Sequence, residues 1–283
     1  MSWFWFAFLT SLFWALGGVL IKPAYKYFSE GQIYAFNGLS FFLIWLVFAL
    51  LTGNSVTCPI NYQLILPLLS PLSFLFFVYS LKNAKPSIIS ALIAASPLVT
   101  TGLSIIFLGE SINSLQLGII ILLVIVLIKL GLTEYKANDE QEWKGFLLGL
   151  ICSMAFGISN AVNKFAVSQI GPVPFSVING VYMIVISRIW LVSSQKITLR
   201  NWQGLVKPIG KQGLLGSLIY GFGGFFFFLG LQSGPASLVT TITNLNVPFT
   251  MIFAGLILKE TTTKTQRILI FLTFLLTTGL VLF

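Results

Sequence analysis

The segment Lys85–Glu110, KPSIISALIAASPLVTTGLSIIFLGE, recurs in altered form as Gly234–Glu260, GPASLVTTITNLNVPFTMIFAGLILKE. Each copy has a proline after its first residue, a second proline near its middle (Pro97 and Pro248) and a closing glutamate. A helix needs about 20 consecutive apolar residues to cross a bilayer, and both copies are long and apolar enough. The chain therefore contains a repeated membrane-spanning segment.

The composition extends this conclusion to the whole chain. The sequence is 57% hydrophobic and only 8% charged, and it has no histidine. A soluble domain has about 25% charged residues, so most of this surface must face lipid. Uncharged runs without period-two alternation predict helices and exclude barrel strands. We expect an all-α integral membrane protein with ten spans: Ser2–Ile21, Gln32–Leu51, Tyr62–Leu81, Pro86–Leu108, Ser114–Leu132, Gly145–Asn163, Val173–Ser193, Gln212–Leu231, Pro235–Leu258 and Gln266–Phe283.

The ten spans divide into two halves. The first span of each half is similar, with Trp14-Ala15-Leu16-Gly17 in one and Met154-Ala155-Phe156-Gly157 in the other. A polar linker, residues 133–144, separates a first repeat (1–132) from a second (145–283). Because each repeat has five spans, an odd number, the second must be inverted relative to the first. Inverted repeats are typical of secondary transporters, whose substrate site lies between the repeats near the bilayer midplane.

The basic residues predict an orientation. All but one of the 16 Lys and Arg residues lie in loops, or near the ends of spans, that would share one side of the membrane; Lys164 is the exception. Cytoplasmic loops are enriched in basic residues, so we expect both termini to be extracytoplasmic. The net charge of +9 is then a topology signal and does not indicate nucleic-acid binding.

Several short motifs resemble those of a known family. They are Trp14 with Lys22 eight positions later, Tyr79-Ser80-Leu81-Lys82-Asn83-Ala84, Ser96-Pro97, Leu108-Gly109-Glu110, Asn246-Val247-Pro248 and Lys259-Glu260. In order and duplication they resemble the EamA-type repeat of the drug/metabolite transporter superfamily. The resemblance implies ten helices around a central site, alternating access, export of small metabolites and residence in the bacterial inner (plasma) membrane. Many members of that family are drawn with cytoplasmic termini, the orientation opposite to the one the charges predict.

The most polar span, Pro235–Leu258, carries the main candidate site. Thr240 and Asn244 are spaced to share one helical face, and Asn246 follows just before Pro248. Proline lacks an N–H donor and frees a carbonyl about one turn earlier, near Asn244. An opened helix beside amides favours a polar cavity, although such amides also serve as hydrogen bonds between helices. We expect Thr240, Asn244 and Asn246 to bind substrate and Pro97 and Pro248 to act as hinges.

The remaining candidates come from other spans at similar depth. We expect these residues to complete the substrate site: Trp14, Tyr79, Ser96, Asn160 and Tyr220. Each has a competing structural role, because span aromatics often pack and a serine often bonds to its own helix. The seven acidic residues all lie in loops or at span ends, so nothing obvious carries a proton through the core. Glu110 and Glu260 are placed where a carboxylate stabilises a helix N-terminus.

These residues separate the possible functions. A membrane-embedded enzyme is not expected, because the common catalytic and metal-ligand sets are missing. We expect no cofactor and no metal. The best prediction is a secondary transporter of a small neutral or zwitterionic metabolite such as an amino acid, existing as a monomer or weak homodimer in the bilayer. The alternatives are a carrier or flippase for a lipid-linked or phosphorylated substrate, with Lys22 or Lys164 at the phosphate, and a non-transporting membrane subunit.

Overall fold

The computed structural model describes residues 2–54, 62–83, 92–134, 140–193, 207–259 and 261–282, and all of their secondary structure is helical. The α-helices are α1 (Ser2–Ile21), α2 (Glu30–Thr52), α3 (Leu69–Asn83), α5 (Ser96–Leu108), α6 (Ser114–Gly131), α7 (Glu140–Ile170), α8 (Pro172–Ser193), α10 (Pro208–Ser233), α11 (Ala236–Thr243), α12 (Asn246–Ile257) and α13 (Lys264–Leu282). Short 3-10 helices are η1 (Lys22–Lys26), η2 (Tyr62–Leu64), η3 (Leu66–Leu68) and η4 (Leu132–Glu134).

Because α11 and α12 divide a single span, these helices make ten spans, and the predicted all-α fold is confirmed. Within the described ranges, six segments are long and apolar enough by themselves to cross a membrane. The first residues of the predicted span Pro86–Leu108, and Glu260, lie outside the described residues.

Two of the predicted spans differ in detail from the helices of the structure. The third span begins with η2 and η3, and its α-helix starts only at Leu69, because Pro67 has no N–H to give to a regular helix. The first helix of the second repeat, α7, is longer than predicted at both ends. It begins at Glu140, inside the predicted linker 133–144, and continues to Ile170. Lys164 therefore lies inside a helix and not in a loop.

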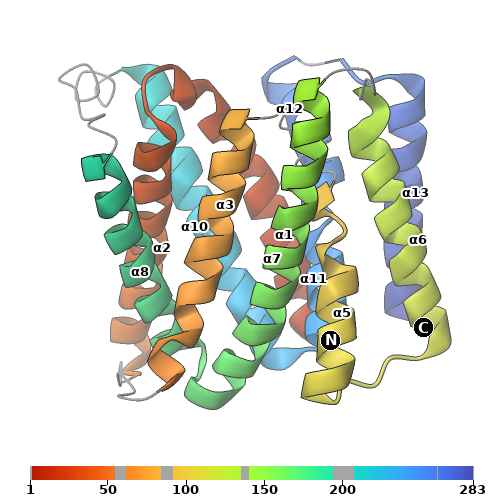
Figure 1. The fold of residues 1–283 in the computed structure, drawn as a ribbon, viewed down its shortest axis with the longest axis horizontal. Coiled ribbons are helices and arrows are strands. Elements are labelled where there is room, and N and C mark those ends of the chain that lie inside the picture. The colour runs from red at the N-terminus through yellow and green to blue at the C-terminus, as the bar shows by residue number, and fades with distance from the viewer. Residues whose placement is uncertain are drawn as a thin grey trace.

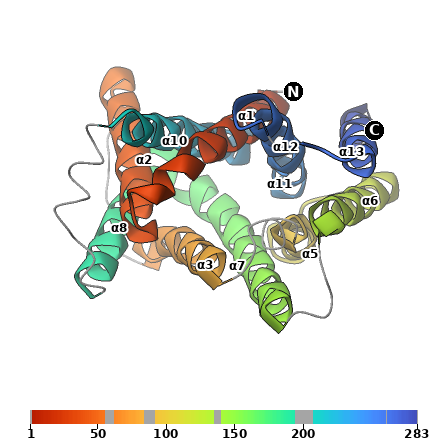
Figure 2. The same ribbon diagram turned by 90° about the horizontal axis from the view of Figure 1, so that it is seen from above.

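The helices run roughly parallel, and both termini lie toward the same end of them, as an even number of spans requires (Figure 1). Seen from above, α2 and α8 pack together at one edge, whereas α6 and α13 pair at the opposite edge (Figure 2). Each pair joins spans at equivalent places in the two repeats, so the repeats meet at both edges of the molecule.

The outer faces of the helices carry large apolar side chains. Ile106 is 72% exposed, Phe107 75% and Leu256 75%. Exposure of this kind along whole helices does not suit a surface in water but suits one in contact with lipid tails.

Among the described helices, α1 and α10 make the most extensive contact, and glycines bring the two backbones together. A Cβ on Gly17 would lie 2.7 Å from Tyr220 N and 2.8 Å from Gly216 O. A Cβ on Gly216 would lie 2.9 Å from Ile21 N and 3.0 Å from Gly17 O. Small residues at contacts of this kind let transmembrane helices pack by close van der Waals approach. Helix α1 of the first repeat is thus fixed to α10 of the second.

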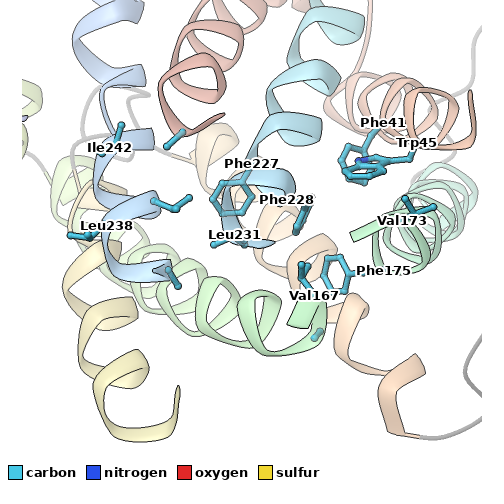
Figure 3. Close-up of a cluster of buried hydrophobic side chains, with 14 of the residues drawn as sticks. Phe41, Trp45, Val167, Val173, Phe175, Phe227, Phe228, Leu231, Leu238 and Ile242 are labelled. Carbon is cyan, nitrogen blue, oxygen red and sulfur yellow. The ribbon is translucent and has the colours of Figure 1, made fainter. Parts of the chain in front are cut away.

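A cluster of buried aromatic and aliphatic residues joins α2 of the first repeat to helices of the second (Figure 3). Phe228 of α10 lies 4.9 Å from Phe175 of α8 and 5.8 Å from Phe41 of α2, measured between ring centroids. Leu231 of α10 and Ile242 of α11 belong to the same cluster and are fully buried. Such aromatic pairs add about 0.5–1.5 kcal/mol each beyond the area they bury. This core forms one wall of the site described next.

Candidate functional site

A partly open cavity of about 190 Å³ lies between the helices, near the middle of the spans. Helices of both repeats line it, among them α1, α2 and α3 of the first and α7, α8 and α10 of the second. A single water needs only about 10–15 Å³ of such space, so the cavity has room for a small organic molecule. Its position between the repeats is where inverted-repeat carriers bind substrate.

Most of the predicted site residues lie around this cavity. The lining includes Trp14, Ser96, Asn160, Tyr220, Thr240, Asn244 and Asn246. The side chain of Tyr79, a residue of α3, lies outside the described part of the structure. The predicted hinges, Pro97 and Pro248, are buried beside the cavity and are not among its lining residues. That the seven predicted lining residues lie around one cavity does not test whether they bind substrate, so their substrate-binding role stays a prediction.

The second repeat opens its helix at the cavity. Helix α11 ends at Thr243 and α12 begins at Asn246, with Asn244 and Leu245 in a turn between them. In the turn, Leu245 N donates to Ile242 O at 3.0 Å and Val247 N donates to Asn244 O at 3.1 Å. In a regular helix the Asn244 carbonyl would accept a hydrogen bond from the backbone N–H of residue 248. That residue is a proline and has no N–H. The chain therefore tightens locally into three-residue spacing.

The first repeat has the matching interruption. Ala94 and Ala95 form a turn just before Ser96-Pro97, and Leu98 N donates to Ala95 O at 3.0 Å. The side-chain amide of Asn244 donates from Nδ2 to Ala94 O at 2.9 Å. The two interruptions thus touch at the centre of the molecule, and one of the predicted site residues holds them together.

Two lining amides were missed by the sequence analysis, Asn37 of α2 and Asn179 of α8. Asn179 Nδ2 donates to Pro67 O at 3.0 Å. Asn37 is only 5% exposed, and its Oδ1 has no hydrogen-bond partner among the residues that the structure describes. A signal was present in the sequence, because both asparagines precede a glycine (Asn37-Gly38 and Asn179-Gly180) in the second span of each repeat.

Aromatic rings supply a second kind of surface. Trp14 of α1 stacks near Tyr220 of α10, with centroids 6.0 Å apart, and Tyr220 lies 6.0 Å from Phe74 of α3. Phe77 of α3 continues the row to Phe156 of α7 at 6.2 Å. None of the lining residues in the described part of the chain is Asp, Glu, Lys or Arg. The cavity therefore combines amides and hydroxyls with aromatic faces and has no charged side chain to neutralise a net charge.

Glu110 and Lys164 act away from the cavity lining. The Glu110 carboxylate accepts from Ala236 N at 2.6 Å, Ser237 N at 3.2 Å and Ser237 Oγ at 2.6 Å. It therefore caps α11 of the other repeat, whereas the helix that follows it, α6, is capped by Asn113. Negative charge is stabilising at a helix N-terminus.

Lys164 binds the other end of the link between α10 and α11. Its Nζ donates to Leu231 O at 2.6 Å and to Gly234 O at 2.9 Å, at the end of α10. A cation is favourable at a helix C-terminus. Together the two ionic side chains fix the short link between α10 and α11 to α7 and to the segment after α5.

The comparisons with known proteins agree with this architecture. The profile of the EamA-like transporter family matches residues 1–131 and again 143–282. A solved structure titled "Crystal structure of protein" is 12% identical, superposes with a TM-score of 0.82, and the match covers 99% of this chain and 94% of that one. At that identity the likeness shows the fold alone. No curated protein gave a significant match. Two family matches that together span nearly the whole sequence mean that this chain belongs to the EamA-like transporter family.

Proposed function

We propose that this EamA-family transporter moves a small neutral or zwitterionic metabolite, such as an amino acid, across the bacterial inner membrane by alternating access. The observation that carries the proposal is the central cavity, whose described lining offers amides and hydroxyls but no charged side chain. Amide groups supply both donors and acceptors, so they match a molecule whose own charges cancel. A strongly ionic substrate would be desolvated there without a counter-charge.

The interrupted helices support the same substrate class. Breaks at Ala94–Ala95 and Asn244–Leu245 place helix ends beside the cavity, where the dipoles of the helices favour polar parts of a substrate. Pro97 and Pro248 are proposed as the hinges of these breaks. The proposed substrate contacts are the predicted residues that line the cavity. We propose export as the direction, which the family resemblance favours.

The competing substrate class, a phosphorylated or lipid-linked molecule, would need a cation at the site. Lys164 is absent from the cavity lining, and its Nζ is already bound to two backbone carbonyls. This observation favours the neutral substrate over the phosphorylated one.

A thermal-shift screen of the purified full chain tests the proposal, followed by counterflow uptake into proteoliposomes. Amino acids and other zwitterions should raise the melting temperature, and those that do should exchange across the vesicle membrane. Stabilisation only by phosphorylated or strongly cationic compounds would contradict the proposed substrate class.

A further inference from the structure

Asn37-Gly38 of α2 and Asn179-Gly180 of α8 form a two-fold-like pair where these helices cross. A Cβ on Gly38 would lie 2.8 Å from Met183 Cβ, and a Cβ on Gly180 would lie 2.9 Å from Phe42 Cβ. Each glycine therefore lets the partner helix approach closely, and each places the preceding asparagine at the central cavity. The two asparagines occupy equivalent places in the two repeats.

Their hydrogen bonding differs in spite of this equivalence. Asn179 is tied to the backbone, because its Nδ2 donates to Pro67 O at 3.0 Å. The Asn37 Oδ1 is buried and has no partner in the described part of the chain. Buried polar atoms in native proteins nearly always have a partner, and leaving one unpaired is costly. The cost is higher still at membrane depth, where bulk water is absent.

We infer that Asn37 is a substrate-binding residue of the central cavity and binds the polar head of a zwitterion through its side-chain amide. The inference rests on the proposed function and deepens it by naming a contact and its chemistry. An amide presents a donor and an acceptor side by side, which suits a head group carrying an ammonium next to a carboxylate. The aromatic row that includes Phe74 and Tyr220 is left for the apolar part of the same molecule.

Two variants of the full-length protein separate this role from a packing role. Asn37→Leu keeps a similar volume and loses no hydrogen bond within the described part of the chain, so its ligand-free melting temperature should equal or exceed that of the wild type. Asn179→Leu is the matched control, because it breaks the hydrogen bond to Pro67 O. Its melting temperature should fall.

Transport supplies the second readout, with a ¹⁴C-labelled mixture of amino acids as the probe in proteoliposomes. At subsaturating concentration, Asn37→Leu should lower uptake about tenfold, the effect of one desolvated hydrogen bond. Asn37→Ser, which retains a donor and an acceptor, should recover part of the uptake. A destabilised or unfolded Asn37→Leu protein, or one with unchanged uptake, overturns the inference.

The two proposals fail in different ways. Wild-type vesicles that take up no more label than protein-free liposomes would refute the proposed amino-acid substrate. Asn37 is then judged on the ligand-free melting temperatures alone. If the melting temperature of Asn37→Leu falls as much as that of Asn179→Leu, the assignment of Asn37 as a binding residue is overturned. An unchanged or raised melting temperature supports the inference that this amide is kept for binding.

Discussion

Asn244 Nδ2 donates a 2.9 Å hydrogen bond to the backbone carbonyl of Ala94, a residue 150 positions earlier in the chain. The bond joins the helix interruptions of the two repeats. Pro97 follows Ala94 by three residues and has no backbone N–H to donate. Carbonyls near this break therefore need hydrogen-bond donors from outside their own helix. Asn244 is thus a tie between the repeats as well as a lining residue of the cavity.

Asn244 and Asn246 are expected to respond differently to the same substitution. Asn244→Leu removes the bond to Ala94 O and should lower stability by about 1 kcal/mol, together with transport. Asn246 is half-buried at the cavity, so Asn246→Leu should keep the melting temperature while substrate affinity falls several-fold. Both quantities are measured on the same purified variants. A lowered melting temperature with unchanged substrate affinity in Asn246→Leu would show that Asn246 does not bind substrate.

Two neighbouring glycines of α1 provide a test of the α1–α10 contact. In Gly17→Ala the new methyl group would lie within 3 Å of backbone atoms of Tyr220 and Gly216, so the helices must separate. In Gly18→Ala the methyl group meets nothing within 4 Å. We expect the first variant to lose stability markedly and the second to gain up to about 1 kcal/mol from helix propensity. Detergent melting curves of both proteins measure this, and equal behaviour would refute the close contact.

Transport should not require an imposed pH gradient, because the acidic residues lie in loops or at span ends and none of the described ones lines the cavity. Glu110→Gln should weaken the cap on α11 and lower the melting temperature without changing any dependence on pH. Uptake is measured in vesicles with and without a gradient. A gradient requirement that disappears with Glu110→Gln or Glu260→Gln would show that a carboxylate carries protons.

Lys164→Met should destabilise the protein, because it removes two hydrogen bonds from an ammonium group to Leu231 O and Gly234 O. Hydrogen bonds to charged groups contribute about 1.5–3 kcal/mol each. Lys211→Met is the control, since Lys211 is exposed at the start of α10. Melting temperatures of the two variants are compared; a similar small change in both would mean that Lys164 only anchors at the interface.

We expect both termini to be extracytoplasmic. The structure places them at the same end of the helices, and the uneven distribution of Lys and Arg assigns the opposite end to the cytoplasm. A C-terminal alkaline phosphatase fusion should be active and a C-terminal green fluorescent protein fusion dark. A bright fluorescent fusion beside an inactive phosphatase fusion would reverse the orientation.

The sequence alone determined the fold class, because apolar runs of membrane length and a duplicated Pro-containing span depend only on local composition and order. It also selected residues that the structure brings to one cavity, such as Trp14, Asn160 and Tyr220. These residues lie at similar distances from the ends of their spans, and that distance can be counted along the sequence of a helix. The helix opening lies beside Pro248. It could be predicted because the missing proline N–H removes a hydrogen bond within a single turn of the same helix.

Partners across the repeats were decided only by the tertiary structure. Glu110 caps α11 and not its own following helix, and Lys164 binds the end of α10. The sequence could not distinguish Asn179, which is bonded to Pro67 O, from Asn37, whose Oδ1 has no partner among the described residues, since both are asparagines before a glycine. Which carbonyl lies within 3 Å of an amide depends on how two helices distant in sequence are rotated and tilted against each other. That geometry is set by the packing of the whole bundle, through close contacts such as Gly17 against Gly216.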